Sequence, residues 1–335
     1  MTHRSSPTSE ELEAARRLIA RHLSPTPVDM GAGTAREPVL KLESLQPTGS
    51  FKVRGALVAL AAAPPEARVV TASSGNHALG VAYAARVLGR RATVVVAANA
   101  SPAKVEALRR SGVDLLQAGR SYDEAEAYAR ELAREGASYL SGYNDPQVIA
   151  GQATIGGELD VQVGGPMTVV CGVGGGGLAA GLGLWAATRP HVRVAGVEVA
   201  VSTAVSTAVT AGRRIPVEVG TTLADGLAGN IEHGSLTIDL ITRHIDAMVT
   251  VTEAEIRTAL RYLAAHRGYV AEGSGAVPVA ALLAGKVPAH GRMVAVVSGR
   301  NIGLPTLAAV LAPPAEAAVG VREAPRPPST GAGPA

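Results

Sequence analysis

Lys52 is the residue of this chain with the clearest capacity for chemistry. It directly follows Phe51 at the end of a run, residues 44–51, that carries no charged side chain. An ordinary surface lysine is a solvated charge. A lysine that is partly removed from water has a lowered pKa and can form a Schiff base with a carbonyl compound. The segment therefore makes Lys52 a candidate for covalent catalysis.

A second candidate segment runs from Thr71 to Ala78 and follows a strand that ends at Val70. Its small polar residues precede a predicted helix, whose first amides and positive dipole end can bind a carboxylate. An ordinary helix cap has the same composition, so this segment alone does not decide between the two. His77 fits the start of a helix better than the role of a general base.

A third segment contains Gly172 and four consecutive glycines, 174–177. Glycines allow the backbone to wrap around a phosphate with several amides pointing inward. The same residues also satisfy the dinucleotide-binding pattern, with Glu198 near the position of a ribose-binding acid. This motif alone would favour NAD. The fourth segment, 297–301, places the hydroxyl of Ser298 directly after a strand, where it could bond to a ring nitrogen.

The elements that must position these residues alternate between strands and helices. Helix starts are indicated by Ser101-Pro102 and by capping boxes at 121–124 and 252–255. Short β-branched runs lie between them, and this alternation predicts parallel sheets covered on both faces. The active site of such a fold lies on the loops at the carboxyl ends of the strands. Those are the loops that carry the candidate residues.

The composition excludes several classes of protein. The 335 residues have a net charge of +3 and only 3% aromatic residues, so the clustered basic and stacking side chains of a nucleic-acid-binding face are missing. Cys171 is the only cysteine and indicates a buried structural thiol. The uncharged stretch 167–187 contains four glycines at its centre, which weaken a membrane helix. With no secretory signal at the start, the chain is predicted to be cytoplasmic, with no membrane or nucleic-acid partner.

Together these segments resemble the threonine/serine dehydratase and serine racemase family, which belongs to the fold type II (β-family) enzymes that use pyridoxal 5'-phosphate (PLP). The resemblance covers about residues 40–301 and rests on separate motifs in the family's order, of which the dinucleotide interpretation explains only one. The motifs are Lys-Leu-Glu-x-Leu-Gln-Pro-Thr-Gly-Ser-Phe-Lys-x-Arg-Gly-Ala at 41–56, Ser-Gly-Asn-His-Ala at 74–78, Asp-Pro-x-Val-Ile-Ala-Gly-Gln at 145–152, the glycines 174–177, Val-Glu at 197–198, Ala-Asp-Gly at 224–226, and Glu272 ahead of Ser-Gly-Ala at 274–276.

The resemblance implies a role for each matching residue. Lys52 would hold PLP as a Schiff base, Phe51 would lie against its ring, Ser298 would bond to the pyridine nitrogen and Asn76 to the phenolic oxygen. The phosphate would lie in the loop formed by Gly174, Gly175, Gly176 and Gly177. The substrate would be bound by Ser74, Gly75, Asn76, His77, Tyr143 and Gly226, with Glu272 and Arg300 in the cavity wall.

The resemblance also implies the architecture. We expect an α/β protein of fold type II with two open, parallel-type sheet domains that have helices on both faces. The large PLP domain would comprise residues 9–66 and 145–312, and a small mobile domain would comprise 67–144. Residues 1–8 are expected to be flexible and 313–335 to be a disordered tail. Relatives are commonly dimers, so a homodimer is expected, and no regulatory domain is expected after the catalytic region.

The implied activity is a PLP-dependent lyase that removes water and then ammonia from a small L-β-hydroxy amino acid such as threonine or serine. Lys52 would take the Cα proton. Ser74 leaves a second possibility open, because serine racemases use a serine here as a base on the face opposite the lysine. A β-replacement synthase and a non-catalytic amino-acid-binding module are further alternatives. Which amino acid is the substrate stays open.

Two departures from the family limit this transfer. Many relatives have Ser-Gly-Gly-Asn where this chain has Arg300 at the third position. The arginine could bind an anionic group or point away from the cofactor. Many relatives also hold a divalent cation with the Glu of Val-Glu and a carboxylate six residues later. Here Glu198 is followed at that spacing by Ala204, so we expect no metal.

Overall fold

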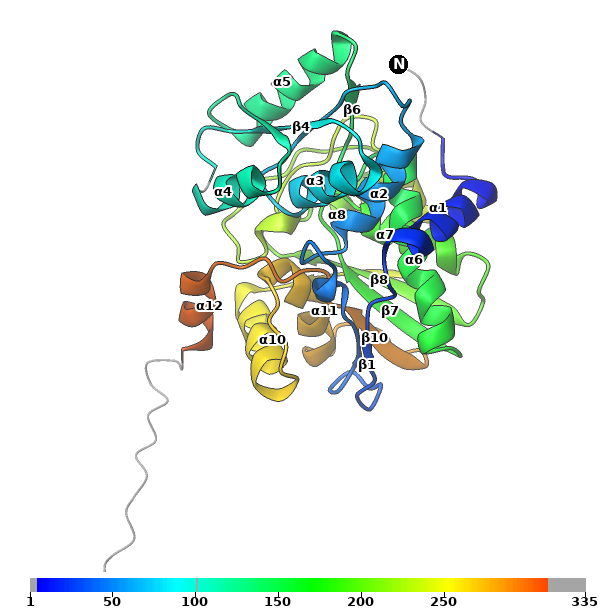
Figure 1. The fold of residues 1–335 in the computed structure, drawn as a ribbon. Helices are drawn as coiled ribbons and strands as arrows, with labels where there is room; N and C mark the ends of the chain where they lie inside the picture. Colours follow the sequence, from blue (N-terminus) through cyan, green and yellow to red (C-terminus); the bar gives the residue numbers. More distant parts are fainter. Residues whose placement is uncertain (1–4, 101, 313–335) are drawn as a thin grey trace, which may run out of the picture.

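A computed structural model describes residues 5–100 and 102–312 as an α/β protein with two sheets, each flanked by helices (Figure 1). Half of the segment predicted to be flexible, 1–8, and the whole predicted tail, 313–335, lie outside the described residues. The first helix is α1 (Ser9–His22), and Thr8 and Glu11 form a reciprocal capping box at its start. No helix of the described part is long and apolar enough to cross a bilayer.

The large sheet has six strands in the order β1-β2-β10-β7-β8-β9. Strand β1 pairs antiparallel with β2, and the remaining pairs are parallel, so the sheet is parallel except at one edge. Its strands are β1 (Val28–Asp29), β2 (Val39–Lys41), β7 (Met167–Gly172), β8 (Val192–Val199), β9 (Ala247–Val251) and β10 (Arg292–Val296).

The small sheet has four parallel strands in the order β5-β4-β3-β6. All of them come from one continuous stretch, 69–139, and β3 lies inside the sheet, so the segment 71–78 leaves the sheet from its interior. The strands are β3 (Val69–Ala72), β4 (Ala92–Val96), β5 (Asp114–Gln117) and β6 (Ser138–Tyr139).

Helices cover both sheets. The small sheet carries α3 (Asn76–Leu88), α4 (Pro102–Arg110) and α5 (Tyr122–Arg134). The remaining helices are α2 (Lys52–Ala62), α6 (Pro146–Gln162), α7 (Gly177–Ala186), α8 (Ala204–Ala211), α9 (Leu236–His244), α10 (Glu253–His266), α11 (Gly273–Leu283) and α12 (Leu304–Leu311), with short 3₁₀ turns η1 (Glu43–Leu45) and η2 (Asp225–Leu227).

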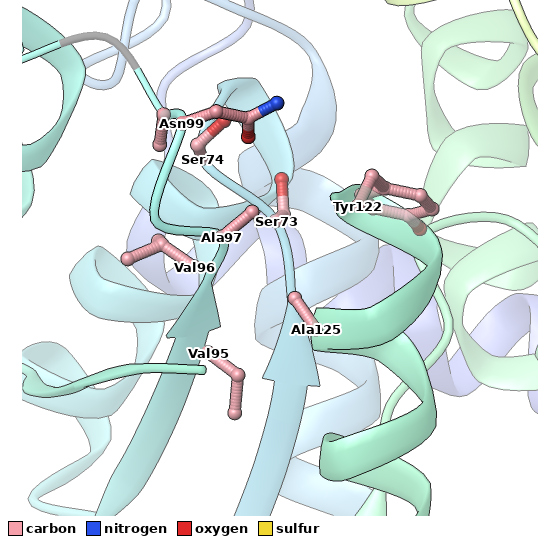
Figure 2. Close-up of a pocket in the computed structure, with 9 residues that line it drawn as sticks. Ser73, Ser74, Val95, Val96, Ala97, Asn99, Tyr122 and Ala125 are labelled. Carbon is pink, nitrogen blue, oxygen red and sulfur yellow. The ribbon is translucent and has the colours of Figure 1, made fainter. Parts of the chain in front are cut away.

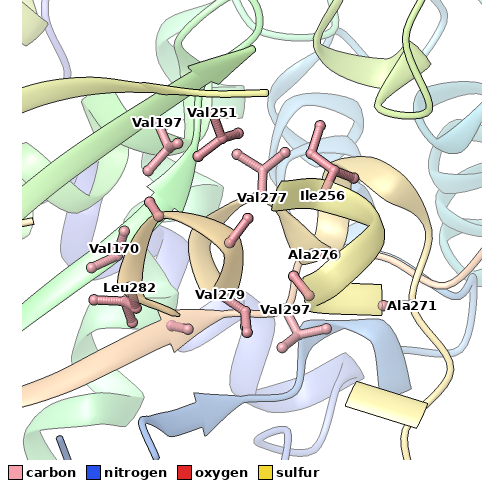
Figure 3. Packing of buried hydrophobic residues seen from close by; sticks show 14 of the residues in the cluster. Val170, Val197, Val251, Ile256, Ala271, Ala276, Val277, Val279, Leu282 and Val297 are labelled. Atoms are coloured by element: carbon pink, nitrogen blue, oxygen red, sulfur yellow. The ribbon is translucent and has the colours of Figure 1, made fainter. Parts of the chain in front are cut away.

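Both faces of the large sheet are buried, which explains the uninterrupted apolar runs in its strands. Along β7, Val170 belongs to the apolar cluster formed with α10 and α11, while Val169 and Cys171 belong to the opposite cluster with α6 and α7. Figure 3 shows Val277 and Val279 of α11 packed among Val170 and other strand residues. Cys171 is a free buried thiol, as predicted, and burial raises its pKa to about 12.

The predicted capping boxes form to different degrees. Thr252 and Glu255 bond reciprocally at the start of α10. Ser121 accepts from the amide of Glu124 at the start of α5, but the carboxylate of Glu124 accepts from the amide of Arg120 instead of closing the box. Both arrangements satisfy amides of the first turn, so both helices begin where the sequence predicts.

A buried ion network fixes the start of α2 against the large sheet. Arg54 donates two hydrogen bonds to Glu43, each 2.8 Å long, and its Nη1 lies 2.6 Å from Glu158 of α6. Lys41 at the end of β2 lies 2.5 Å from the other oxygen of Glu158. Three residues of the 41–56 motif therefore serve to hold the segment that carries Lys52.

Candidate active site

Lys52 begins α2, at the junction of the two sheets. Its Nζ donates a 2.7 Å hydrogen bond to the carbonyl of Gly142, just after the small sheet's last strand, and lies 5.3 Å from the centre of the Phe51 ring. The amide of Phe51 donates to the carbonyl of Ser298, after the last strand of the large sheet. The backbone thus holds the lysine between loops that are far apart in the sequence.

The surroundings of Lys52 favour its neutral form. Burial lowers the pKa of the amine to about 8, and the negative charge of Glu272 opposes the shift only in part. A neutral amine is both a nucleophile and a base, whereas an ammonium ion is neither. With a pKa of about 8, roughly a tenth of Lys52 is neutral at pH 7, which is far more than for an ordinary lysine.

The four glycines connect β7 to α7, as expected for a phosphate-binding loop. Gly176 has a left-handed φ of 89°, which side-chain-bearing residues rarely adopt. A Cβ on Gly175 would run into the ring of Tyr143, and one on Gly174 would lie 3.0 Å from the Cα of Leu227. The loop can pass so close to its neighbours only as glycine, and it leads into the N-terminus of α7, where free amides favour an anion.

Asn76 is held in place by two side chains. Its Nδ2 donates to Glu272 at 2.6 Å, and its Oδ1 accepts from Asn301 at 2.7 Å. Glu272 comes from the segment that precedes α11, and Asn301 also donates to the carbonyl of Thr48. One hydrogen of the Asn76 amide is left for another acceptor, so the residue is a donor of fixed orientation.

His77 is buried beside Gly142, the residue that binds Lys52. Its Nε2 lies 3.0 Å from the hydroxyl of Thr71, and a Cβ on Gly142 would lie 3.2 Å from its ring. Burial and the positive charge of Lys52 lower the pKa of His77 to about 3. The imidazole is therefore neutral at physiological pH and suited to hydrogen bonding.

Ser74 lies in the loop between β3 and α3, next to the small sheet. It lines a small hollow together with Ser73, Asn99 and Tyr122, beyond the carboxyl ends of β3 and β4 (Figure 2). The hydroxyl of Ser73 accepts from the amide of Gly75 and so shapes the turn into α3. Ser74 and Asn99 both line this hollow.

Ser298 has a hydrogen-bond partner because α11 contains a proline. Pro278 has no N–H to donate to the carbonyl of Ser274 one turn earlier. The hydroxyl of Ser298 lies 3.5 Å from that carbonyl. Gly226 completes this part of the site: its carbonyl lies against Gly174, and a Cβ on it would lie 3.0 Å from the Ser274 hydroxyl.

Tyr143 and Arg300 have different surroundings. The ring of Tyr143 lies over Gly175, and its hydroxyl accepts a 2.7 Å hydrogen bond from the amide of Glu232. The guanidinium of Arg300 donates to the carbonyl of Ser44 in η1. The arginine is therefore bound to the loop that precedes Lys52, and its place in the cavity wall stays a prediction.

Glu198 caps the start of α8. Its carboxylate accepts from the amides of Val205, at 2.7 Å, and Ser206, at 3.0 Å, at the start of α8. Both oxygens of the Glu198 carboxylate are therefore engaged by the start of α8. Among residues 5–100 and 102–312, no group of three or more His, Cys, Asp or Glu side chains is placed to hold a metal ion.

The fold and this arrangement are those of a PLP enzyme, and residues 19–299 match the family model described as pyridoxal-phosphate dependent enzyme. The chain belongs to this family. An L-threonine ammonia-lyase of Geobacter sulfurreducens is 41% identical over 81% of this chain and 69% of its own length, and a putative threonine dehydratase of Sinorhizobium fredii is 37% identical over 91% and 95%. Maize serine racemase has a TM-score of 0.84 at 29% identity, covering 91% of this chain and 97% of its own. A threonine deaminase from T.th. has a TM-score of 0.81 at 36% identity, covering 89% and 99%.

The residues present fit PLP. The buried hydroxyl of Ser274 has no hydrogen-bond partner, although an unpaired buried hydroxyl is costly. Ser298 has only a long bond, the amine of Lys52 is largely deprived of water, and the glycine loop cannot tolerate side chains. A bound ring and phosphate would give these groups partners.

Three contributors to the site were not predicted as site residues. Gly142 provides the carbonyl for Lys52, Ser274 provides an unpaired hydroxyl, and Asn301 orients Asn76. Asn301 and Ser274 lie inside motifs that the sequence analysis quoted, so their positions could have indicated them. Gly142 acts through its backbone, which no residue type reveals.

Proposed function

We propose that this protein removes water and then ammonia from a small L-β-hydroxy amino acid, with L-threonine as the first substrate to test. The observation that carries the proposal is Lys52, whose largely desolvated amine donates to the carbonyl of Gly142. Gly142 lies beside the ring of His77 and directly precedes Tyr143, whose ring covers the glycine loop. The similarity to threonine ammonia-lyases at 37–41% identity supports this choice of substrate.

In this proposal Lys52 holds PLP covalently, Gly174 to Gly177 bind the phosphate, Ser298 bonds to the ring nitrogen and Asn76 to the phenolic oxygen. When bound, PLP withdraws electrons from the Cα of an attached amino acid and so acidifies its proton. The amino group of the substrate would take the place of Lys52 on PLP, and the freed amine, neutral above a pKa of about 8, would accept that proton at Nζ.

The segment 74–77 orients the substrate. Its backbone amides, at the start of α3, bind the carboxylate, and neutral His77 keeps positive charge away from Lys52. The ring of Tyr143, together with Gly226, closes the side of the pocket near the glycine loop. These contacts fix which Cα substituent faces Lys52.

Ser74 supports racemisation as a second candidate function. Ser74 directly precedes Gly75 and Asn76 in the segment proposed to bind the substrate, and a serine racemase is among the similar structures. A base opposite Lys52 would return the proton to the other face of Cα.

Substrate tests separate the two functions. Release of 2-oxo acid from L-threonine, L-serine and bulkier β-hydroxy amino acids identifies the dehydratase and its substrate. Chiral analysis of recovered substrate, with deuterium exchange at Cα, identifies the racemase. Ser74→Ala should abolish racemisation and spare elimination if Ser74 is a base. If Ser74 only binds the carboxylate, the change should weaken substrate binding about three- to tenfold. Wild-type protein that releases no 2-oxo acid from any of these substrates would contradict the main proposal.

We also propose that the protein is a cytoplasmic homodimer without a structural metal. The exposed Leu304 and Leu311 of α12 offer an apolar surface that a second copy can cover.

Chelators should leave activity and the thermal midpoint unchanged, because Glu198 is engaged by α8. A loss of activity that Mg²⁺ or Ca²⁺ restores would contradict the absence of a metal.

A further inference from the structure

Glu232, in the loop between η2 and α9 on the large-sheet side, joins segments that come from both sheets. One carboxylate oxygen accepts from the hydroxyl of Ser141 at 2.5 Å. The other accepts from the side-chain amide of Asn144 at 3.2 Å and lies 2.9 Å from Nη2 of Arg130. The carboxylate therefore has three donors, each about 90 or more residues away in the sequence.

Arg130 connects Glu232 to the body of the small sheet. It belongs to α5, which packs against β3 and β4. The same guanidinium lies 2.7 Å from Glu126 and 4.2 Å above the ring of Tyr139, whose hydroxyl also donates to Glu126. The arginine is thus fixed within the small-sheet side, and its contact with Glu232 bridges the two sides.

The segment 141–144 connects Glu232 to the active site. Between the two residues that donate to the carboxylate lie Gly142, which accepts from Lys52, and Tyr143, whose ring covers Gly175. The backbone amide of Glu232 donates to the hydroxyl of Tyr143 at 2.7 Å. One residue thus fixes both ends and the central ring of a segment that contacts the amine and the glycine loop.

We propose that Glu232 is a positioning residue that couples the docking of the small-sheet side to the geometry around Lys52. Its bond to Arg130 holds α5 in place, and its bonds to 141–144 hold Tyr143 over the glycine loop and Gly142 against the lysine. The proposal deepens the elimination function proposed above and rests on it for its kinetic consequences only.

Two substitutions separate the two halves of this role. Glu232→Gln keeps the size of the side chain but offers a single acceptor oxygen to three donors, so both α5 and 141–144 should loosen. Arg130→Met removes the bridge from α5 to Glu232, together with the contacts of Arg130 with Glu126 and Tyr139, and leaves Ser141 and Asn144 bonded to Glu232. The matched control is Asp160→Asn, which breaks the 2.7 Å ion pair with Arg189 within the large-sheet side.

Hydrogen exchange of the PLP-loaded proteins tests the coupling without reference to activity. Glu232→Gln should speed amide exchange about tenfold or more in 122–134 and in 138–145, whereas Arg130→Met should speed it in 122–134 only. Both should leave 167–172, in the core of the large sheet, unchanged. Asp160→Asn should change neither segment. Exchange in Glu232→Gln equal to that of the control would overturn the proposal.

Kinetics supply the second measurement. Arg130→Met should raise KM for the amino acid several-fold at unchanged kcat, because only docking is weakened. Glu232→Gln should also lower kcat, by about tenfold or more, because charged hydrogen bonds that fix 141–144 are lost. Equal kcat values in Glu232→Gln and wild type would overturn the positioning role. If the wild type has no eliminase activity, the exchange pattern still decides the coupling, so the two proposals fail separately.

Discussion

Lys41 and Lys52 lie eleven residues apart in one motif, and both are largely withdrawn from water. Lys41 is fully paired: it contacts a carboxylate of Glu158, the side chain of Gln162 and the carbonyl of Thr26. The amine of Lys52 donates to one carbonyl, that of Gly142, and Glu272 acts on it only at longer range. Burial makes a lysine structural when its charge is matched, and reactive when it is not.

The causes of the pKa shifts of the two lysines express the same difference. Burial lowers the pKa of both amines, and for Lys41 the carboxylates of Glu158 and Glu43 oppose the shift. For Lys52, Glu272 opposes it too weakly to keep the pKa above about 8. Substituting each lysine by methionine, which has a similar length and no charge, therefore sharpens the comparison.

The largest effect is expected for Lys52→Met. Loss of the amine removes both the covalent attachment and the base, so activity should fall by about a thousandfold or more. The thermal midpoint of the PLP-free protein should stay within a few degrees of the wild type, because no buried ion pair is broken. The rate of 2-oxo acid release measures the activity, and thermal unfolding measures the midpoint. A variant that retains a tenth of the activity would show that another group is the base.

A change in stability is expected for Lys41→Met. The substitution leaves one oxygen of Glu158 without its 2.5 Å partner in a buried site. Breaking a buried pair from one side should lower the free energy of unfolding by about 3 kcal/mol, as measured by denaturant titration. Protein that remains folded should keep most of its activity per mole. A fully stable Lys41→Met would mean that the ion network does not hold α2.

A smaller effect distinguishes the two amines in the unmodified chain. In PLP-free protein, labelling of Lys52 by an amine-specific reagent should rise as pH passes about 8, well below the value near 10.5 for ordinary lysines. Because the unfolded state binds more protons between these values, Lys52 should also add stability as pH rises from about 8 to 10.5. Lys41, whose side chain is fully buried, should stay unlabelled. Mass spectrometry of the peptides measures the extent of labelling of Lys41 and of Lys52. Equal labelling of the two lysines would contradict the account.

The sequence predicted the parallel sheets, the loops that carry the site and the cofactor family because these depend on local patterns and ordered motifs. It did not separate Lys41 from Lys52 by their partners, since Glu158 and Gly142 lie about a hundred residues further along the chain. The effect of Pro278 on Ser298 was equally hidden, because it acts through a missing backbone donor. Domain limits and individual site roles remain predictions.

The most direct test is borohydride reduction of the purified holoenzyme, followed by peptide mapping. The account predicts yellow protein and a PLP-derived label fixed irreversibly to Lys52, with none on Lys41, Lys104 or Lys286. Colourless protein, or a label on another lysine of the folded enzyme, would contradict the central claim that the desolvated amine of Lys52 holds the cofactor.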